Sequence, residues 1–280
     1  MIIADWKTRR LIAAAVFAAG LPTLACCAAE FVSSKPQERV DYWQLRQAEI
    51  TALLKDTPRL APVRLVFLGD SITDFWHLGD NPWFPGQKCG RAVWDESFGG
   101  KPAENLSLNL GISGDRLEHI LFRLLPQSAG GRGELDAAGL HPDFIVLMVG
   151  INNTFAAEDP MLESVFAGIQ AVLTAVRKRQ PSATVILQSL LPTNDETKNR
   201  DLVRPVNQRL AALADSAPFA GSVRYLDLYS AFVDASGKQL SQCFNDGLHP
   251  NESGYRIWRD KLVPFLSQVR ASSKSKPTSS

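Results

Sequence analysis

The chain has 280 residues, 45% of them hydrophobic and 21% charged, and a formal net charge of +1 from 30 basic and 29 acidic residues. This length allows a sizeable buried core, in one large domain or two small ones. Because lysine and arginine are scattered and nearly balanced by acidic residues, the composition argues against a nucleic-acid-binding surface and a polybasic membrane patch.

Residues 1–29 have the pattern of a secretory signal peptide. A basic head that ends at Arg10 precedes an apolar run from Leu11 to Gly20, and a stretch of small residues ends at Ala29. The apolar run is shorter than the roughly 20 residues that a membrane span needs. We therefore expect cleavage near Ala29 and an exported protein, periplasmic or secreted, without stable membrane insertion.

The route of export stays open at this point. Arg9-Arg10 is compatible with a twin-arginine signal as well as with the general secretory route. Cys26, preceded by Ala25, offers a lipoprotein acylation site as the less favoured alternative, because Thr23 suits that signal poorly.

Two cysteines, Cys89 and Cys243, remain after the expected cleavage. An oxidising compartment favours a disulfide between them. Two free, buried thiols that pack as small hydrophobic groups are the alternative.

Short β-rich runs alternate with amphipathic stretches from Pro36 to Val269. Five apolar runs bounded by turn residues are typical of strands buried on both faces: Val63–Leu68, Leu106–Leu110, Phe144–Val149, Ala183–Leu187 and Val223–Leu228. Four stretches with apolar residues every three or four positions predict helices; they begin at Leu117, Leu162, Val203 and Tyr255. The alternation predicts one α/β domain over 30–270 with a five-stranded parallel sheet and helices on both faces.

The tail from Ala271 to Ser280 consists almost entirely of Ser, Lys, Pro and Thr. Such a segment has little to bury, so we expect it to be disordered.

Polar motifs follow the predicted strands, where ligands bind in parallel sheets. Ser71 follows the first strand in Gly69-Asp70-Ser71, Gly111 follows the second and Asn152 the third, while Asp246 and His249 precede the last helix. Each motif alone is weak, and Ser71 by itself is equally compatible with a helix N-cap. Their placement together indicates a catalytic site.

These four blocks resemble those of the SGNH (GDSL-type) hydrolases. Within that family the chain is similar to the catalytic subunits of brain-type platelet-activating-factor acetylhydrolase, from about Val63 to Leu266. The resemblance implies a three-layer, flavodoxin-like sheet and ester hydrolysis without a metal. The signal peptide and a Trp-rich insertion at His77–Trp94 depart from that subgroup and put a phospholipid substrate in doubt.

The residue types fit this chemistry. A serine hydroxyl needs a base to take its proton, and His249 can serve because an imidazole titrates near pH 6.5. Asp246, three residues earlier, can accept the Nδ1 proton of His249 and fix the tautomer that leaves Nε2 free. Asp70 is interpreted as a turn-forming and helix-capping carboxylate rather than a second acid.

An oxyanion intermediate needs hydrogen-bond donors. The expected donors are the backbone N–H groups of Ser71 and Gly111 and the side-chain amide of Asn152; glycine allows close backbone approach. No His, Cys and Asp cluster has metal-ligand spacing, so we expect neither a metal nor another cofactor.

Four aromatic residues in and beside the insertion have two interpretations. Trp76, Trp83, Phe84 and Trp94 are compatible with a sugar-stacking surface or with packing of the insertion itself.

We therefore expect an extracytoplasmic serine esterase that hydrolyses short-chain, acetyl-type carboxylic esters, with O-acetyl groups on glycans as candidate substrates. The alternatives are a lysophospholipase or thioesterase of the same fold and, in a different class, a catalytically inactive glycan-binding module. The intact set of predicted catalytic residues argues against a pure binding module. The expected partner is a small-molecule or glycan ester, not a nucleic acid.

Overall fold

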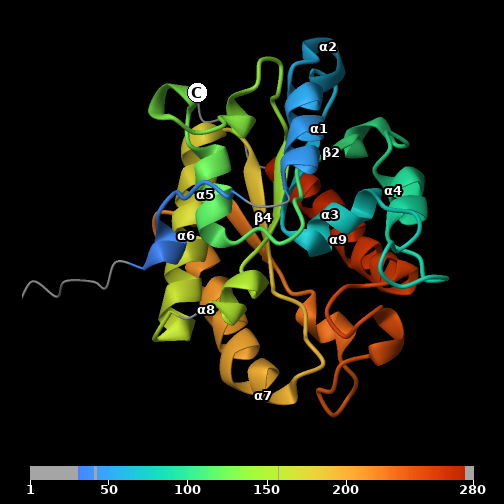
Figure 1. Ribbon diagram of the computed structural model, residues 1–280. Coiled ribbons are helices and arrows are strands. Elements are labelled where there is room, and N and C mark those ends of the chain that lie inside the picture. Colours follow the sequence, from blue (N-terminus) through green and yellow to red (C-terminus); the bar gives the residue numbers. More distant parts are fainter. Residues whose placement is uncertain (1–30, 41–42, 157, 275–280) are drawn as a thin grey trace, which may run out of the picture. The chain divides into compact units, whose positions relative to one another are not determined.

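Five parallel strands form one sheet in the computed structural model, which describes residues 31–40, 43–156 and 158–274 (Figure 1). The strands are β1 (Leu65–Gly69), β2 (Ser107–Asn109), β3 (Phe144–Met148), β4 (Thr184–Gln188) and β5 (Val223–Leu226). Each strand lies within one residue of a predicted apolar run. The predicted five-stranded sheet is therefore confirmed.

The sheet has the spatial order β2-β1-β3-β4-β5, and every neighbouring pair is parallel. The chain runs from β1 to β2 on one side and returns to β3 on the other. The strand order thus reverses between β1 and β3, which creates a crevice at their carboxyl ends. The segments that follow these two strands carry Ser71 and Asn152.

Helices cover both faces of this sheet (Figure 1). The α-helices in the described part of the chain are α1 (Gln44–Leu54), α2 (Thr57–Leu60), α3 (Ser71–Asp74), α4 (Arg91–Ser97), α5 (Leu117–Leu124), α6 (Met161–Arg179), α7 (Glu196–Lys198), α8 (Arg204–Asp215) and α9 (Glu252–Lys274). Helix α6 packs against α5 and α8 on one face, and α4 packs against α9 on the other. All four predicted amphipathic helices are present.

The last helix extends further than the sequence suggested. Helix α9 ends at Lys274, so the residues from Ala271 to Lys274 are helical rather than disordered. The first helix-breaking residue after Val269 is Pro277, and the helical hydrogen bonds continue until close to it. Residues 275–280 and the predicted signal peptide (1–29) lie outside the described residues. No described helix is long and apolar enough to cross a membrane.

An aromatic cluster joins α9 to the 3₁₀ helix η2 (Phe75–His77), which directly follows α3. The ring of Trp76 lies 4.4 Å from that of Tyr255 and 5.2 Å from that of Trp258. The hydroxyl of Tyr255 donates a hydrogen bond to the carbonyl oxygen of Ile72 at 2.8 Å. The C-terminal helix therefore supports the short helix α3, which begins at Ser71.

The two described cysteines, Cys89 and Cys243, are both free and buried. The expected disulfide is thus not formed. Both side chains belong to the hydrophobic core, where a thiol packs as a small apolar group. Burial raises the pKa of the Cys89 thiol to about 11.

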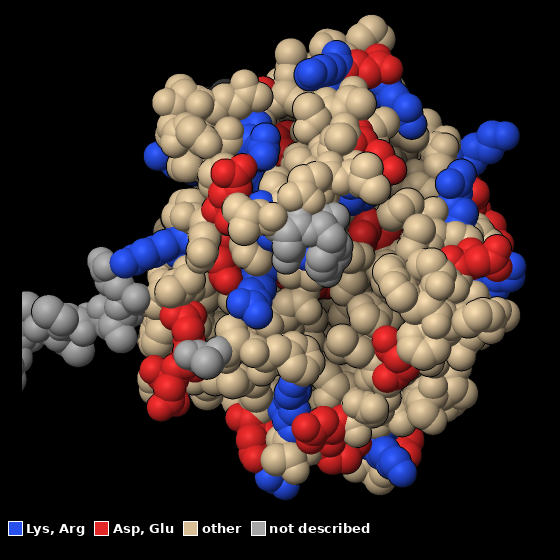
Figure 2. Space-filling model, viewed as in Figure 1, with Lys and Arg blue, Asp and Glu red and all other residues tan. Residues whose placement is uncertain are grey.

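Charges of both signs are interspersed over the surface seen in Figure 2. Exposed arginines pair with nearby carboxylates, as Arg91 does with Asp95 (2.7 Å) and Arg209 with Glu163 (2.6 Å). Exposed pairs of this kind contribute at most about 1 kcal/mol each. The stability of the fold therefore comes mainly from its buried core.

Candidate active site

Ser71 lies at the tight junction between β1 and α3. The preceding residue, Asp70, caps the helix, because its Oδ1 accepts a hydrogen bond from the N–H of Ile72 at 3.0 Å. This confirms the capping role expected for Asp70. As the first residue of α3, Ser71 has a backbone N–H without an acceptor inside the helix. The junction thus presents both the hydroxyl and the amide of Ser71 at the end of the strand.

Ser71, His249 and Asp246 form a continuous hydrogen-bonded chain. The Nε2 atom of His249 lies 2.8 Å from Ser71 Oγ, and its Nδ1 atom lies 2.7 Å from Asp246 Oδ2. Ser71 is only 6% exposed. The structure therefore brings together the three residues predicted to be catalytic, in the geometry that a serine nucleophile and its base require.

The local backbone holds Asp246 in its ionised form. Its Oδ1 accepts the backbone N–H groups of His249 (2.7 Å) and Leu248 (2.9 Å). Partial burial alone would raise the pKa of Asp246, but the hydrogen bonds from His249 and Leu248 lower it to about 2. Asp246 is thus ionised at neutral pH and accepts the Nδ1 proton of His249.

Hydrogen bonds hold the loop that carries Asp246 and His249 against the segment that follows β4. The carbonyl oxygen of Gly247 accepts hydrogen bonds from Asn194 N (2.9 Å) and Gln239 Nε2 (2.8 Å). Gln239 Nε2 also donates to the carbonyl oxygen of Pro192 at 2.7 Å. These hydrogen bonds fix the position of the loop, and with it that of His249, relative to the sheet.

Asn152 lies in the 3₁₀ helix η6 (Ile151–Phe155), directly after β3. Its side-chain Nδ2 donates to the carbonyl oxygen of Asp115 at 2.8 Å. An amide nitrogen carries two hydrogens, so one N–H positions the side chain and the other can bind an oxyanion.

Gly111 does not have the role that the sequence suggested. Its N–H donates to Asn109 Oδ1 at 2.8 Å and is therefore already engaged. A Cβ atom at this position would lie 2.3 Å from the backbone nitrogen of Asp74. The physical reason for glycine here is the close approach of two backbone segments, and the oxyanion assignment of Gly111 is withdrawn.

Gly114, three residues further on, is the residue that the sequence analysis missed. Its φ of +81° is in the left-handed region that favours glycine. Its N–H donates to no residue in the described part of the chain. It also lies directly before Asp115, whose carbonyl oxygen holds Asn152. The sequence does contain a hint of this residue, because the block Gly111-Ile112-Ser113-Gly114 has a second glycine that could equally well supply a backbone N–H.

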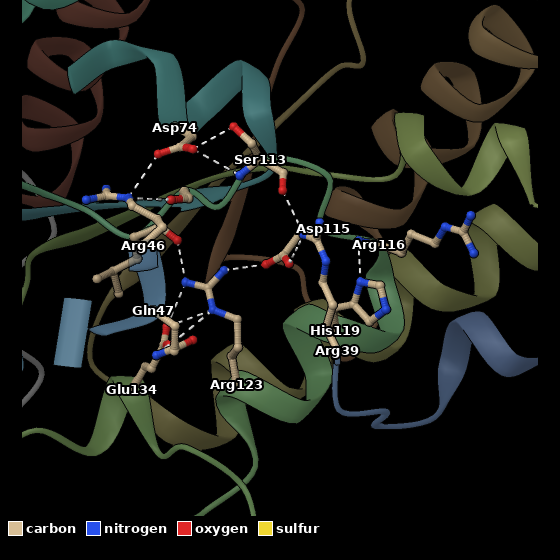
Figure 3. A network of polar contacts seen from close by, with 12 residues as sticks. Arg39, Arg46, Gln47, Asp74, Ser113, Asp115, Arg116, His119, Arg123 and Glu134 are labelled. Atoms are coloured by element: carbon tan, nitrogen blue, oxygen red, sulfur yellow. Dashed lines mark hydrogen bonds and ion pairs between the residues drawn. The ribbon is translucent and has the colours of Figure 1, made fainter. Parts of the chain in front are cut away.

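The segment around Gly114 is fixed on both sides by a polar network (Figure 3). On one side, the N–H and Oγ of Ser113 both donate to Asp74 Oδ2, at 3.0 and 2.6 Å. On the other, the carboxylate of Asp115 pairs with Arg39 (3.2 Å) and with Arg123 (2.6 Å). The N–H of Gly114 is therefore held in a defined place.

Arg123 is the centre of that network and is fully buried. It also pairs with Glu134 at 2.7 Å, and its guanidinium donates to the carbonyl oxygen of Leu110. Burial alone would lower the pKa of Arg123, but the carboxylates of Glu134 and Asp115 raise it. The arginine stays charged and joins three segments of the chain.

The aromatic residues of the insertion divide into two groups. Trp76 is buried and Trp94 packs against the core. Trp83 and Phe84 are 61% and 37% exposed. Packing thus explains the first pair and leaves the second pair available for contact with a ligand. No group of three or more metal-binding side chains is found among the described residues.

Comparison with known proteins agrees with this geometry. The model of the GDSL-like lipase/acylhydrolase family matches residues 67–257. Platelet-activating factor acetylhydrolase IB subunit alpha1 of Pongo abelii is 33% identical over 210 residues, which cover 73% of this chain and 77% of the relative.

Two solved structures show the same fold. A GDSL-like lipase from Bacteroides thetaiotaomicron superposes with a TM-score of 0.56 at 20% identity and covers 81% of this chain and 98% of its own. An acetyl xylan esterase superposes with a TM-score of 0.50 at 17% identity and covers 73% of this chain and 100% of its own.

Proposed function

The chain belongs to the GDSL-like lipase/acylhydrolase family and is a serine carboxylic-ester hydrolase, and we propose that it hydrolyses short-chain, acetyl-type esters outside the cytoplasm. The observation that carries the catalytic part is the hydrogen-bonded chain from Ser71 through His249 to Asp246. The extracytoplasmic part is supported by the signal-peptide pattern of residues 1–29. O-acetyl groups on glycans are the proposed natural substrates.

In the proposed first step, Ser71 Oγ attacks the carbonyl carbon of the ester while His249 Nε2 takes the hydroxyl proton. The carbonyl π electrons move to the oxygen and form an oxyanion. When this tetrahedral intermediate collapses, the bond to the alcohol breaks and His249 gives its proton to the leaving oxygen. The product of this step is an acyl-serine and a free alcohol.

The second step uses the same groups on water. His249 removes a proton from a water molecule, which attacks the acyl-serine carbonyl. Collapse of the second intermediate returns the proton to Ser71 and releases a carboxylic acid. Asp246 holds the His249 ring through its Nδ1 and stabilises the imidazolium in both steps.

Three donors are proposed for the oxyanion: the N–H of Ser71, the N–H of Gly114 and the side-chain amide of Asn152. Ser71 and Gly114 offer backbone N–H groups at fixed positions, and Asn152 is oriented by the carbonyl oxygen of Asp115. Donors that are already in position stabilise the oxyanion without any cost of reorganising the site during the reaction.

The test compares hydrolysis of acetyl, octanoyl and palmitoyl esters of p-nitrophenol by the wild type and by Ser71→Ala. The expected result is a preference for the acetyl ester, with activity near background in a folded Ser71→Ala variant. A preference for palmitoyl would indicate a lysophospholipase-type or thioesterase-type acyl site. Retention of more than a few per cent of the activity in Ser71→Ala would exclude this serine as the nucleophile.

A further inference from the structure

An exposed tryptophan, Trp83, is connected to the catalytic base through one intervening aromatic ring, that of Phe75. The ring of Phe75 stacks on the ring of His249, with centroids 4.8 Å apart and an interplanar angle of 24°. Trp83 stacks on Phe75 in turn, at 5.2 Å and 17°. Phe75 is buried within this stack, whereas Trp83 is 61% exposed. The stack therefore runs from the active site out to solvent and ends in a flat indole.

The loop that carries Trp83 is well ordered by its own hydrogen bonds. The buried side chain of Asn81 accepts the backbone N–H groups of Trp83 (2.9 Å) and Phe84 (3.2 Å) through Oδ1. At the base of the loop, Asp80 and Lys88 form an antiparallel bridge and an ion pair. An exposed aromatic ring held in this way can bind a ligand without first paying the entropy of ordering its loop.

The other exposed aromatic side chains are less suitable as binding surfaces. Phe155, three residues after Asn152, is 62% exposed, but the ammonium of Lys198 lies 3.5 Å above its ring and covers one face. Phe84 is 37% exposed and has no ring contact with the stack among the described residues. Trp83 alone of these three is connected to His249 through stacked rings.

The position of the stack identifies the part of the substrate that it meets. His249 must give its proton to the leaving alcohol oxygen, so the alcohol lies on the His249 side of the ester carbonyl and the oxyanion lies on the Gly114 and Asn152 side. The ring stack begins at His249. A substrate group that extends along it is therefore the alcohol and not the acyl chain.

We propose that Trp83 is a binding subsite for the alcohol part of the ester and that this alcohol is a pyranose ring. The inference rests on the proposed ester hydrolysis. A flat indole with an electron-rich face favours a flat partner that presents C–H groups, and one face of a pyranose offers such groups while its hydroxyls stay in water. A linear alkyl alcohol would leave most of the indole surface unused.

The experiment measures kcat and KM for three esters that differ in one part at a time: methyl acetate, a mono-O-acetylated methyl xylopyranoside and methyl octanoate. Each is tested on the wild type, Trp83→Ala, Trp83→Phe and the matched control Phe84→Ala. For Trp83→Ala, KM for the sugar acetate should rise roughly three- to tenfold, the size of one aromatic contact. The change in KM of Trp83→Ala for methyl acetate should be much smaller than for the sugar acetate. Trp83→Phe should retain most of the affinity for the sugar acetate, and Phe84→Ala should resemble the wild type.

Two results would overturn the subsite while leaving ester hydrolysis intact. A loss in Trp83→Ala confined to methyl octanoate would mean that the indole binds the acyl chain. Equal effects on the sugar acetate and on methyl acetate would mean that Trp83 supports the fold or His249 and binds no sugar. A wild type that hydrolyses none of the three esters would overturn the proposed function, and this inference with it.

Discussion

The side-chain amide of Asn152 is anchored to the carbonyl oxygen of Asp115 by a hydrogen bond of 2.8 Å. Because one N–H is used for this contact, the other is held in a fixed direction. If it binds the oxyanion, Asn152→Ala should lower kcat by about 10²–10³ with a much smaller change in KM. Steady-state kinetics on methyl acetate at matched folded fraction would measure this split.

The neighbouring residue provides a structural comparison. The side chain of Asn153 is buried, accepts the N–H of Leu117 (2.9 Å) and donates to Glu118 (2.8 Å). Asn153→Ala should therefore lower the free energy of unfolding by about 1–3 kcal/mol and leave kcat of the folded fraction intact. Equal losses of kcat at both positions would contradict the oxyanion role of Asn152.

Replacing Asp246 by Asn should leave the loop geometry largely in place and lower kcat by about 10³–10⁴, because an amide favours the wrong tautomer of His249. The matched control is Asp227→Asn. Asp227 accepts hydrogen bonds from the N–H and Oγ of Ser230 (3.2 and 2.5 Å) and is exposed. An active Asp246→Asn enzyme together with an inactive Asp227→Asn enzyme would require a different acid.

Asp70 should make stability depend on pH in the direction opposite to most carboxylates. Burial raises the pKa of Asp70 to about 7 from the ordinary value of 3.8. Between these two values the folded protein keeps the proton and the unfolded chain releases it. The free energy of unfolding should therefore fall as pH rises through this range, with a contribution of about 1.4 kcal/mol per pH unit from this one group.

The variant Asp70→Asn removes this titration and keeps the cap, since an amide oxygen can also accept the N–H of Ile72. Urea unfolding of the wild type and the variant at pH 4.5, 6.0 and 7.5 would measure the difference between them. The advantage of the variant should grow with pH. A constant difference would show that Asp70 does not titrate between about pH 4 and 7.

Replacing the buried Arg123 should lower the free energy of unfolding strongly. Arg123→Leu removes the buried arginine that pairs with Glu134 and one of the two arginines that pair with Asp115. Leaving buried carboxylates with too little positive charge should lower the free energy of unfolding by about 3–5 kcal/mol. Arg91→Leu, which breaks an exposed pair with Asp95, should cost at most about 1 kcal/mol. Denaturant unfolding of the two variants checks the contrast, and similar small values would argue against a structural role of the buried network.

The sequence was sufficient for the sheet, the four amphipathic helices and the residues that meet in the Ser71–His249–Asp246 chain. These follow from local hydrophobic periodicity and from the rule that parallel strands end at one edge. The sequence could not show that Gly111 is unsuitable as an oxyanion donor, because its N–H is engaged by the side chain of Asn109, whose position depends on the folded structure. Nor could it separate Trp83 from Trp76, because the burial of Trp76 depends on packing against Tyr255 in a distant helix.

The two partners of the 2.8 Å contact between Ser71 and His249 are 178 residues apart in the chain. At about 5–20 residues per second, a ribosome synthesises Ser71 roughly 10–40 s before its base. During that interval His249, the base that takes its proton, is not yet part of the chain. Esterase activity in a translation reaction would thus report only chains that extend beyond residue 249, and a product that stops before this residue should show no esterase activity.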